Sequence, residues 1–288
     1  MRLYRTAMPM PPFALALALV LTMPLAACSS SGPDAAVNTV ENAANVAAAE
    51  NAALAEPPPA PLGKAFSVKD RNDLLEFSYK YPGEAAGVPE IVSVLKTDMD
   101  KGRAGALRDA EAGRRESKAN GFPFNAYSLE TEWKVRGDTP RFLSIASETY
   151  IFSGGAHGMT AYDALLWDRG QRRLLKTTDL FTSPAAFATA ARPGFCKALD
   201  AARAEKRKGY GEDAVASPDD PFNACVDPLK QTLVPVGKKG MLSAIRVIIG
   251  PYEAGPYVEG SYEIDVPVTG AVLAAVKPEY RGAFAVKE

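Results

Sequence analysis

The residue types with the greatest chemical potential in this chain lie in one short glycine-rich stretch, Ser153–Gly158. It holds His157, the only histidine among the 288 residues. Three glycines, Gly154, Gly155 and Gly158, permit backbone angles that residues with a Cβ resist, so the chain can turn sharply here or approach another group closely. Strand-like alternation on both sides of the stretch predicts a turn between two strands.

An imidazole in such a turn has three possible roles. It can act as a general base, contact a ligand or partner, or hydrogen-bond the backbone and stabilise the turn. A catalytic triad needs a nucleophile, and Ser153 lies four residues from His157, but the sequence around it lacks the Gly-x-Ser-x-Gly pattern of a nucleophile elbow. The structural role is therefore favoured first, contact second and catalysis last.

A second group of functional residue types follows a predicted strand near the C-terminus. Tyr252 and Tyr257 each follow a proline, and Gly260 comes three residues later, where it fits a bend or bulge. Tyrosine combines a large ring with a polar tip, so the pair could form a contact surface for a sugar or a protein. The interpretation favoured first is a strand crossing in which both rings pack and their hydroxyls bind the backbone. We expect this segment to lie close in space to Ser153–Gly158.

The composition excludes several functional classes. Hydrophobic residues make up 47% and charged residues 23%, as in a globular protein with a core. A net charge of −1 and a pI near 6.0 give no electrostatic footprint for nucleic acid. Zinc sites need about four histidine, cysteine or carboxylate ligands, which one histidine and three cysteines rarely supply. The sequence thus predicts no metal, no cofactor and no nucleic-acid partner.

The N-terminus has the organisation of a lipoprotein signal peptide, residues 1–27. Arg2 and Arg5 form a positive region, and Phe13–Leu21 is an apolar run too short to span a bilayer. The Leu-Ala-Ala-Cys sequence that ends at Cys28 resembles the bacterial lipobox. This resemblance implies cleavage before Cys28 and lipidation of that residue, so that the membrane becomes a partner through the lipid.

The segment after the lipobox, residues 28–63, is predicted to be a tether. Its Ala-, Asn- and Pro-rich composition cannot bury a core. Ser29, rather than an aspartate, follows the cysteine, which favours the outer membrane of a Gram-negative bacterium. The folded domain would then lie in the periplasm or at the cell surface.

The remaining residues alternate between strand and helix patterns. Helical spacing is seen from Val88 onward to Lys118 and again after Pro184, with Ser183 as N-cap and Pro193 as an expected kink or break. Period-two patterns or hairpin signals mark the strands: Leu75–Tyr81, Tyr127–Arg136, Phe142–Phe152, Met159–Trp167, Thr232–Val236, Leu242–Ile249 and Tyr257–Val268. We therefore predict an α+β fold in which antiparallel meanders and hairpins pack with two main helices.

Two cysteines remain if Cys28 carries lipid. Cys196 lies on the second predicted helix and Cys225 in the loop after it. In an exported protein this pair predicts a disulfide. A redox-active pair is the alternative, although such pairs are more often spaced Cys-x-x-Cys.

Three motifs in the folded part resemble extracytoplasmic domains of the RsiV and PdaC type. They are Phe152–Gly158, Asp179–Phe181 and Ile249–Gly260, the last of which matches a Pro-Tyr-x-x-x-Pro-Tyr-x-x-Gly signature. The resemblance implies a PdaC-like N-terminal module at residues 64–154. It also implies an RsiV-like C-terminal module at residues 155–288, packed with the first as one unit.

This resemblance implies a binding module rather than an enzyme. RsiV-type anti-sigma factors receive lysozyme through this module, whereas PdaC deacetylation belongs to a separate metal-binding domain. A lipobox here replaces the sigma-binding part, so no sigma factor is expected as a partner. The expected function is a non-enzymatic envelope lipoprotein that binds a lysozyme-like muramidase or peptidoglycan. The alternatives are a structural lipoprotein that docks another envelope protein and a hydrolase that uses His157.

Overall fold

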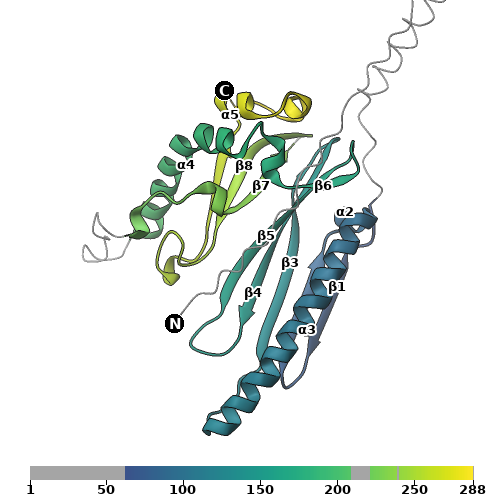
Figure 1. The fold of residues 1–288 in the computed structure, drawn as a ribbon, viewed down its shortest axis with the longest axis vertical. Helices are drawn as coiled ribbons and strands as arrows, with labels where there is room; N and C mark the ends of the chain where they lie inside the picture. Colours follow the sequence, from purple (N-terminus) through teal and green to yellow (C-terminus); the bar gives the residue numbers. More distant parts are fainter. Residues whose placement is uncertain (1–61, 209–220, 239, 288) are drawn as a thin grey trace, which may run out of the picture. The chain divides into compact units, whose positions relative to one another are not determined.

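The computed structural model describes residues 62–208, 221–238 and 240–287, which belong to one compact unit (Figure 1). The predicted signal peptide, Cys28 and nearly all of the predicted tether lie outside the described residues. In the described part of the chain, no helix has both the length and the apolar character needed to cross a membrane.

The described residues contain a larger sheet of six strands in sequential order. All neighbours are antiparallel except β2 and β3, which are parallel because a long helix connects them. The predicted meander is therefore confirmed. The parallel pair β2–β3 is an addition to the predicted antiparallel pattern, and the first strand was not predicted. The strands are β1 (Phe66–Arg71), β2 (Leu75–Tyr81), β3 (Tyr127–Asp138), β4 (Phe142–Phe152), β5 (Met159–Asp168) and β6 (Arg173–Leu175).

One face of this sheet packs against the long helix α3 (Pro89–Asn120), which follows the short α2 (Gly83–Ala86). Alternation along β2 buries Phe77 and Tyr79 beneath the helix, as its period-two pattern predicted. The Tyr79 hydroxyl donates to Asp98 on α3 and accepts from the Trp133 indole of β3, both at 2.9 Å. This network ties the helix to two neighbouring strands.

The other face is covered in part by a second sheet of three antiparallel strands in the described residues: β7 (Thr232–Lys238), β8 (Met241–Ile249) and β9 (Tyr262–Pro267). Ala146 of β4, Val234 of β7 and Ile248 of β8 are buried together between the sheets. Helix α4 (Pro184–Lys206) covers the outer face of this second sheet (Figure 1). The layers are therefore α3, the large sheet, the small sheet and α4, and the predicted α+β class is confirmed.

Helix α4 begins as its sequence predicted. The Ser183 hydroxyl accepts a hydrogen bond from the amide of Ala186 at 3.0 Å, and Pro184 occupies the first turn, where it needs no amide hydrogen. Pro193 lies inside the helix and does not split it. The predicted disulfide is confirmed: Cys196 of α4 is bonded to Cys225, with a Cα–Cα distance of 5.4 Å.

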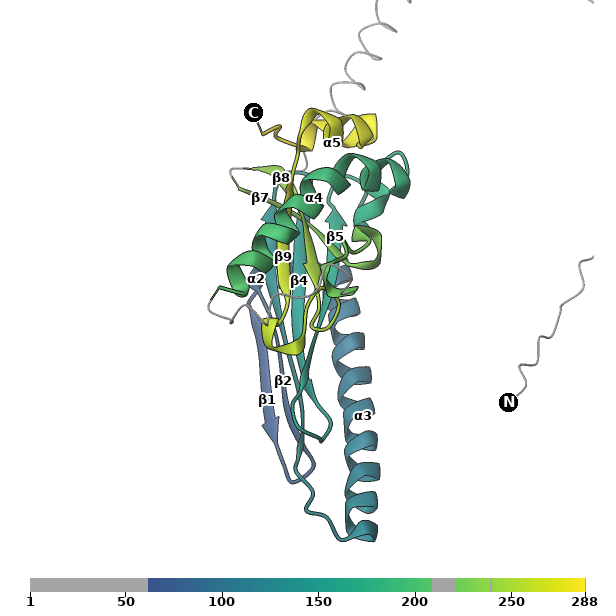
Figure 2. The same ribbon diagram turned by 90° about the vertical axis from the view of Figure 1, so that its left-hand side faces the viewer.

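The C-terminal elements depart from the sequence patterns. Only Tyr262–Pro267 of the strand predicted at residues 257–268 is extended, because Tyr257–Glu259 forms a 3₁₀ turn and Gly260, at φ +63° and ψ −144°, then redirects the chain. Helix α5 (Gly270–Ala275) was not predicted and lies beside α4 (Figure 2). The 3₁₀ helices are η1 (Thr177–Leu180), η3 (Pro221–Asn223), η4 (Pro228–Lys230), η5 (Tyr257–Glu259) and η6 (Pro278–Ala283).

Replacing Cys196 and Cys225 together by alanine is expected to lower the free energy of unfolding by about 3 kcal/mol, because the unfolded chain regains the freedom of a long closed loop. Urea unfolding of oxidised wild type, reduced wild type and the double variant measures this loss. Reduction should destabilise the wild type as much as the double substitution does. Equal stability of all three would contradict a stabilising disulfide.

Candidate functional site

The structure brings together the two motifs that the sequence singled out. The β4–β5 turn carries His157, and the β8–β9 loop carries Tyr252 and Tyr257. The His157 ring stacks on Tyr257 with a centroid distance of 3.8 Å and an interplanar angle of 19°. The Tyr252 and Tyr257 ring centroids lie 5.5 Å apart. We call these three residues the aromatic cluster.

The carbonyl of Gly158 joins the two motifs. It accepts a hydrogen bond from the Tyr257 hydroxyl at 2.8 Å and lies 3.1 Å from Nδ1 of His157. Because a carbonyl oxygen can only accept, this contact places the proton of a neutral imidazole on Nδ1. Nε2 is then an acceptor for the Tyr252 hydroxyl, which lies 3.4 Å away. His157 thus contacts the backbone of its turn, as in the structural role, and contacts both tyrosines as well.

Backbone geometry explains the glycines of the β4–β5 turn. Gly154 and Gly155 have φ angles of +90° and +88°, which L-residues with a side chain rarely adopt. At Gly158 a Cβ would lie 2.5 Å from the ring of Tyr150, so a side chain there would displace this ring. The turn therefore depends on glycine for its conformation at two positions and for close packing at a third.

The aromatic cluster is open to solvent. The side chain of Tyr252 is 47% exposed, His157 is exposed, and Tyr257 is half-buried. Tyr252 also has a φ angle of +68°, a left-handed conformation that costs roughly 1–2 kcal/mol for a residue with a side chain. Such strained, exposed aromatic residues are typical of contact sites rather than of packing alone.

A buried ion pair holds the β8–β9 loop in place. The carboxylate of Glu259 contacts Arg207 Nε at 2.7 Å and accepts a hydrogen bond from the Tyr262 hydroxyl. The ammonium of Lys206 donates to the backbone carbonyls of Glu259 and Ser261. The end of α4 is thereby joined to the segment that carries Tyr257.

The protonation of Glu259 reflects this arrangement. Burial by itself would raise the pKa of the Glu259 carboxyl, but hydrogen bonds from Arg207 and Tyr262 and the charges of Arg207 and Lys206 outweigh it, so the pKa is lowered. Gly255 belongs to the same arrangement, because a Cβ there would collide with the Glu259 carboxylate.

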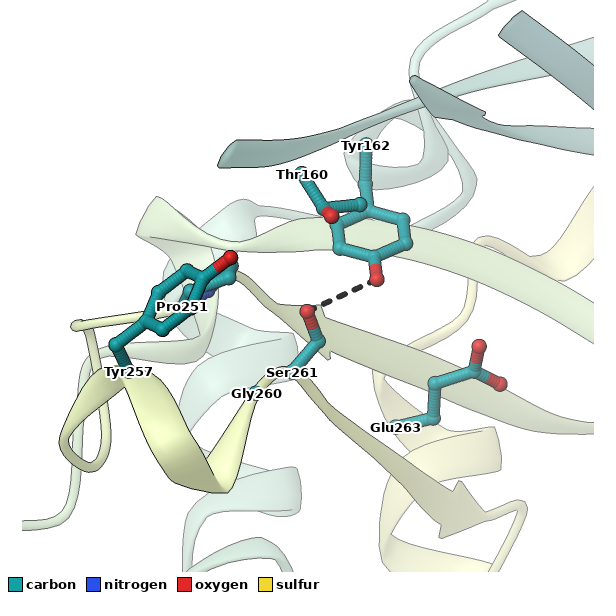
Figure 3. Close-up of a pocket in the computed structure, with 7 residues that line it drawn as sticks. All are labelled: Thr160, Tyr162, Pro251, Tyr257, Gly260, Ser261 and Glu263. Carbon is teal, nitrogen blue, oxygen red and sulfur yellow. Dashed lines mark hydrogen bonds between the residues drawn. The ribbon is translucent and has the colours of Figure 1, made fainter. Parts of the chain in front are cut away.

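A pocket of about 420 Å³ lies beside the aromatic cluster, between β5 and the start of β9 (Figure 3). The Tyr162 hydroxyl donates to Ser261 Oγ across it at 2.9 Å. It is lined by Thr160, Tyr162, Pro251, Tyr257, Gly260, Ser261 and Glu263.

Sequence reasoning identified Tyr257 and Gly260 but missed most of this lining. Thr160 and Tyr162 are two residues apart on β5, and Ser261 and Glu263 are two residues apart at β9, so each pair shares one side of its strand. The spacing of two residues was the sequence signal from which each pair could have been found. It could not show that the two strands face one another, because they belong to different sheets.

The described residues contain no group of three or more histidine, cysteine or acidic side chains placed to hold a metal ion. Nor does His157 hydrogen-bond a carboxylate in this part of the chain, since its two ring nitrogens contact the Gly158 carbonyl and the Tyr252 hydroxyl. What the site offers a ligand is ring surface, hydroxyl groups and the carboxylate of Glu263.

Comparison with known proteins gives a family-level match for part of the chain. Residues 68–160 match the family model described as deacetylase PdaC, a match that ends in β5 and does not include the β8–β9 loop. No curated protein sequence matches the chain.

Two solved structures resemble the chain at low sequence identity. A DUF3298 family protein from Pseudomonas aeruginosa PAO1 has a TM-score of 0.44 and 18% identity, over 80% of this chain and 99% of that one. A DUF3298 family member from Bacteroides fragilis NCTC 9343 has a TM-score of 0.48 and 17% identity, over 78% and 98% of the two chains.

Replacing Glu259 by glutamine is expected to lower the free energy of unfolding at pH 7 by about 3 kcal/mol, because it removes the charge of the buried carboxylate that pairs with Arg207. The folded-state pKa of Glu259 is lowered, so its stabilisation is present above the unfolded pKa and disappears as the pH falls through the folded value. Urea titrations should therefore show the difference between wild type and variant shrinking below about pH 4.3.

Glu205→Gln serves as the matched control, because Glu205 forms an exposed pair with Lys208. It should change the free energy of unfolding by less than about 0.5 kcal/mol. If both variants lost the same amount, the buried pair would not be what holds the loop.

Proposed function

We propose that this chain is a cell-envelope lipoprotein whose folded domain is a non-enzymatic binding module for a lysozyme-like muramidase or peptidoglycan. The observation that carries the proposal is the aromatic cluster, in which two motifs 95 residues apart place His157 and Tyr252 together on the surface. Exposed aromatic side chains gathered at one place are typical of surfaces that contact another molecule.

The cluster has the properties of a preformed contact surface. The Gly158 carbonyl fixes Tyr257 and His157 before any partner arrives, so binding costs little side-chain ordering. Tyrosine also contributes large contact area with few rotatable bonds. Val258, which is 72% exposed, and Met159 add apolar surface on the same loop and strand.

The choice of partner comes from the RsiV resemblance, whose signature contains Tyr252, Tyr257 and Gly260. The PdaC family match supports the N-terminal part of that resemblance. A non-enzymatic role is proposed because Nδ1 of His157 contacts the Gly158 carbonyl and Nε2 contacts the hydroxyl of Tyr252, rather than a serine, threonine or cysteine side chain.

The proposed anchor is a lipid on Cys28 in the outer membrane. Residues 28–63 would then separate the domain from the bilayer by as much as about 110 Å when extended. This reach would let the domain search the periplasm or the cell surface for its partner.

A structural role in docking another envelope protein is the second candidate, and one feature favours it. Among the described strands, β1 forms one edge of the larger sheet and pairs on its inner side with β2, so its outer backbone groups are placed to accept a strand from a partner. A single stable partner crosslinked to β1 in cells, with the aromatic cluster dispensable, would favour this function.

Replacing Tyr252 by alanine is expected to weaken partner binding at least tenfold while leaving the fold intact, because the ring is exposed. The full chain, solubilised in mild detergent, is tested by pull-down with lysozymes and with isolated wall sacculi. His157→Ala is tested in parallel, since it removes the ring that stacks on Tyr257.

Phe122→Ala is the control for this experiment, because Phe122 is an aromatic residue with 69% exposure that follows α3. It should bind as the wild type does. The proposal fails if the wild type binds neither muramidases nor sacculi, or if Tyr252→Ala and Phe122→Ala behave alike.

Replacing Cys28 by serine is expected to release the protein from membranes, because serine cannot carry the thioether-linked lipid. Cell fractionation followed by immunoblotting measures the distribution, with Ser31→Ala as a control substitution in the same segment. Continued membrane attachment of Cys28→Ser would refute the lipobox assignment.

A further inference from the structure

We infer that the pocket between β5 and β9 binds a pyranose ring of an uncharged oligosaccharide. The juxtaposition of Thr160 and Tyr162 with Ser261 and Glu263 carries this inference (Figure 3). It deepens the proposed function and rests on it for the biological source of the sugar. The pocket and the aromatic cluster use different residues except Tyr257, so the two proposals can fail separately.

The walls of the pocket have the chemistry that a sugar ring requires. The hydroxyl groups of Thr160 and Ser261 can donate to a ligand, the Tyr162 hydroxyl oxygen can accept, and Glu263 supplies a carboxylate acceptor. The rings of Tyr162 and Tyr257 offer flat apolar surfaces on which the C–H face of a pyranose can stack. The volume of about 420 Å³ is within the range of small-molecule sites, roughly 300–1,000 Å³.

The charges around the pocket argue against ionic ligands. Glu263 forms ion pairs with Arg246 and, at 3.7 Å, with Arg136, so its negative charge is already compensated. Among the described residues that line the pocket there is no lysine or arginine, and the two arginines that contact Glu263 are already paired with its carboxylate. A neutral ligand with many hydroxyl groups fits this balance best.

The pocket is preorganised by contacts that do not need a ligand. Tyr162 donates its hydroxyl hydrogen to Ser261, which leaves the Ser261 hydrogen available to a ligand oxygen. The Ser261 carbonyl is held by Lys206, and the Tyr257 hydroxyl is held by Gly158. Gly260 adopts a conformation that glycine alone tolerates, and the space where its Cβ would stand is empty.

A second cavity suggests a ligand longer than one ring. It has a volume of about 260 Å³ and shares Thr160, Tyr162 and Pro251 with the first pocket. It adds the amide of Gln231 and two side chains of opposite charge, Lys230 and Glu253. Two adjacent cavities with a common wall suit consecutive rings of a chain. Affinity should therefore rise from a monosaccharide to a trisaccharide.

The full chain in mild detergent is titrated with tri-N-acetylchitotriose, cellotriose, maltotriose and free N-acetylglucosamine by isothermal calorimetry. We expect tri-N-acetylchitotriose to bind with a Kd below about 1 mM and at least tenfold more tightly than the monosaccharide. Absence of binding by all three trisaccharides overturns the inference. If muramidases or sacculi were still bound, the proposed function would stand without the sugar-binding inference. If the trisaccharide were bound but muramidases and sacculi were not, the sugar-binding inference would stand and the proposed function would fail.

Thr160→Trp is expected to fill the pocket and weaken trisaccharide binding at least tenfold. Asp163→Trp places the same bulk on the opposite, exposed side of β5 and should leave the affinity within twofold of wild type.

Tyr162→Phe is the conservative second variant and should weaken binding about threefold to tenfold by removing one hydroxyl. Circular dichroism and urea midpoints verify folding, and wild-type affinity in a folded Thr160→Trp or Tyr162→Phe protein overturns the inference.

Discussion

The buried carboxylate of Glu259 is the group on which the candidate site depends. A buried carboxylate without partners would cost several kcal/mol, so the β8–β9 loop is stable only where Arg207 and Tyr262 reach Glu259. The contacts of Glu259 also fix the positions of the residues that precede and follow it in the chain. Tyr257 is placed against the β4–β5 turn, and Ser261 is placed opposite Tyr162. The aromatic cluster and the pocket therefore share one support, which comes from the end of α4.

The position of the site follows from how far the small sheet covers the large one. Along β4 the side chains that face the small sheet change from apolar at Phe142 and Ala146 to polar at Glu148 and Tyr150. The apolar side chains are buried where the two sheets are in contact. The polar side chains lie beyond the edge of the small sheet, where solvent reaches the large sheet. Tyr162 lies at this boundary, with its ring partly buried and its hydroxyl bonded to Ser261. The pocket forms where the two sheets stop excluding water from each other.

Local patterns predicted most of the fold because they record burial directly. The alternation in β2 through β5 and the helical spacing of α4 each reflect one face packed against a core. What failed depended on partners distant in sequence. Strand β1 is half-exposed with three charged residues, so its pattern is weak, and it is stabilised by pairing with β2. The parallel pairing of β2 with β3 follows from the path of α3, which no local pattern specifies.

The same distinction applies to the candidate site. His157, Tyr252 and Tyr257 could be identified because a single histidine among glycines and a repeated Pro-Tyr pair are unusual in any sequence. Thr160, Tyr162, Ser261 and Glu263 are ordinary strand residues, and only the packing of two sheets makes them neighbours. Gly158 joins the two sequence motifs: its missing Cβ leaves room for the Tyr150 ring, and its carbonyl oxygen accepts a hydrogen bond from the Tyr257 hydroxyl. The two sequence motifs are therefore one structural unit, because the geometry of each is completed by a hydrogen bond to the other.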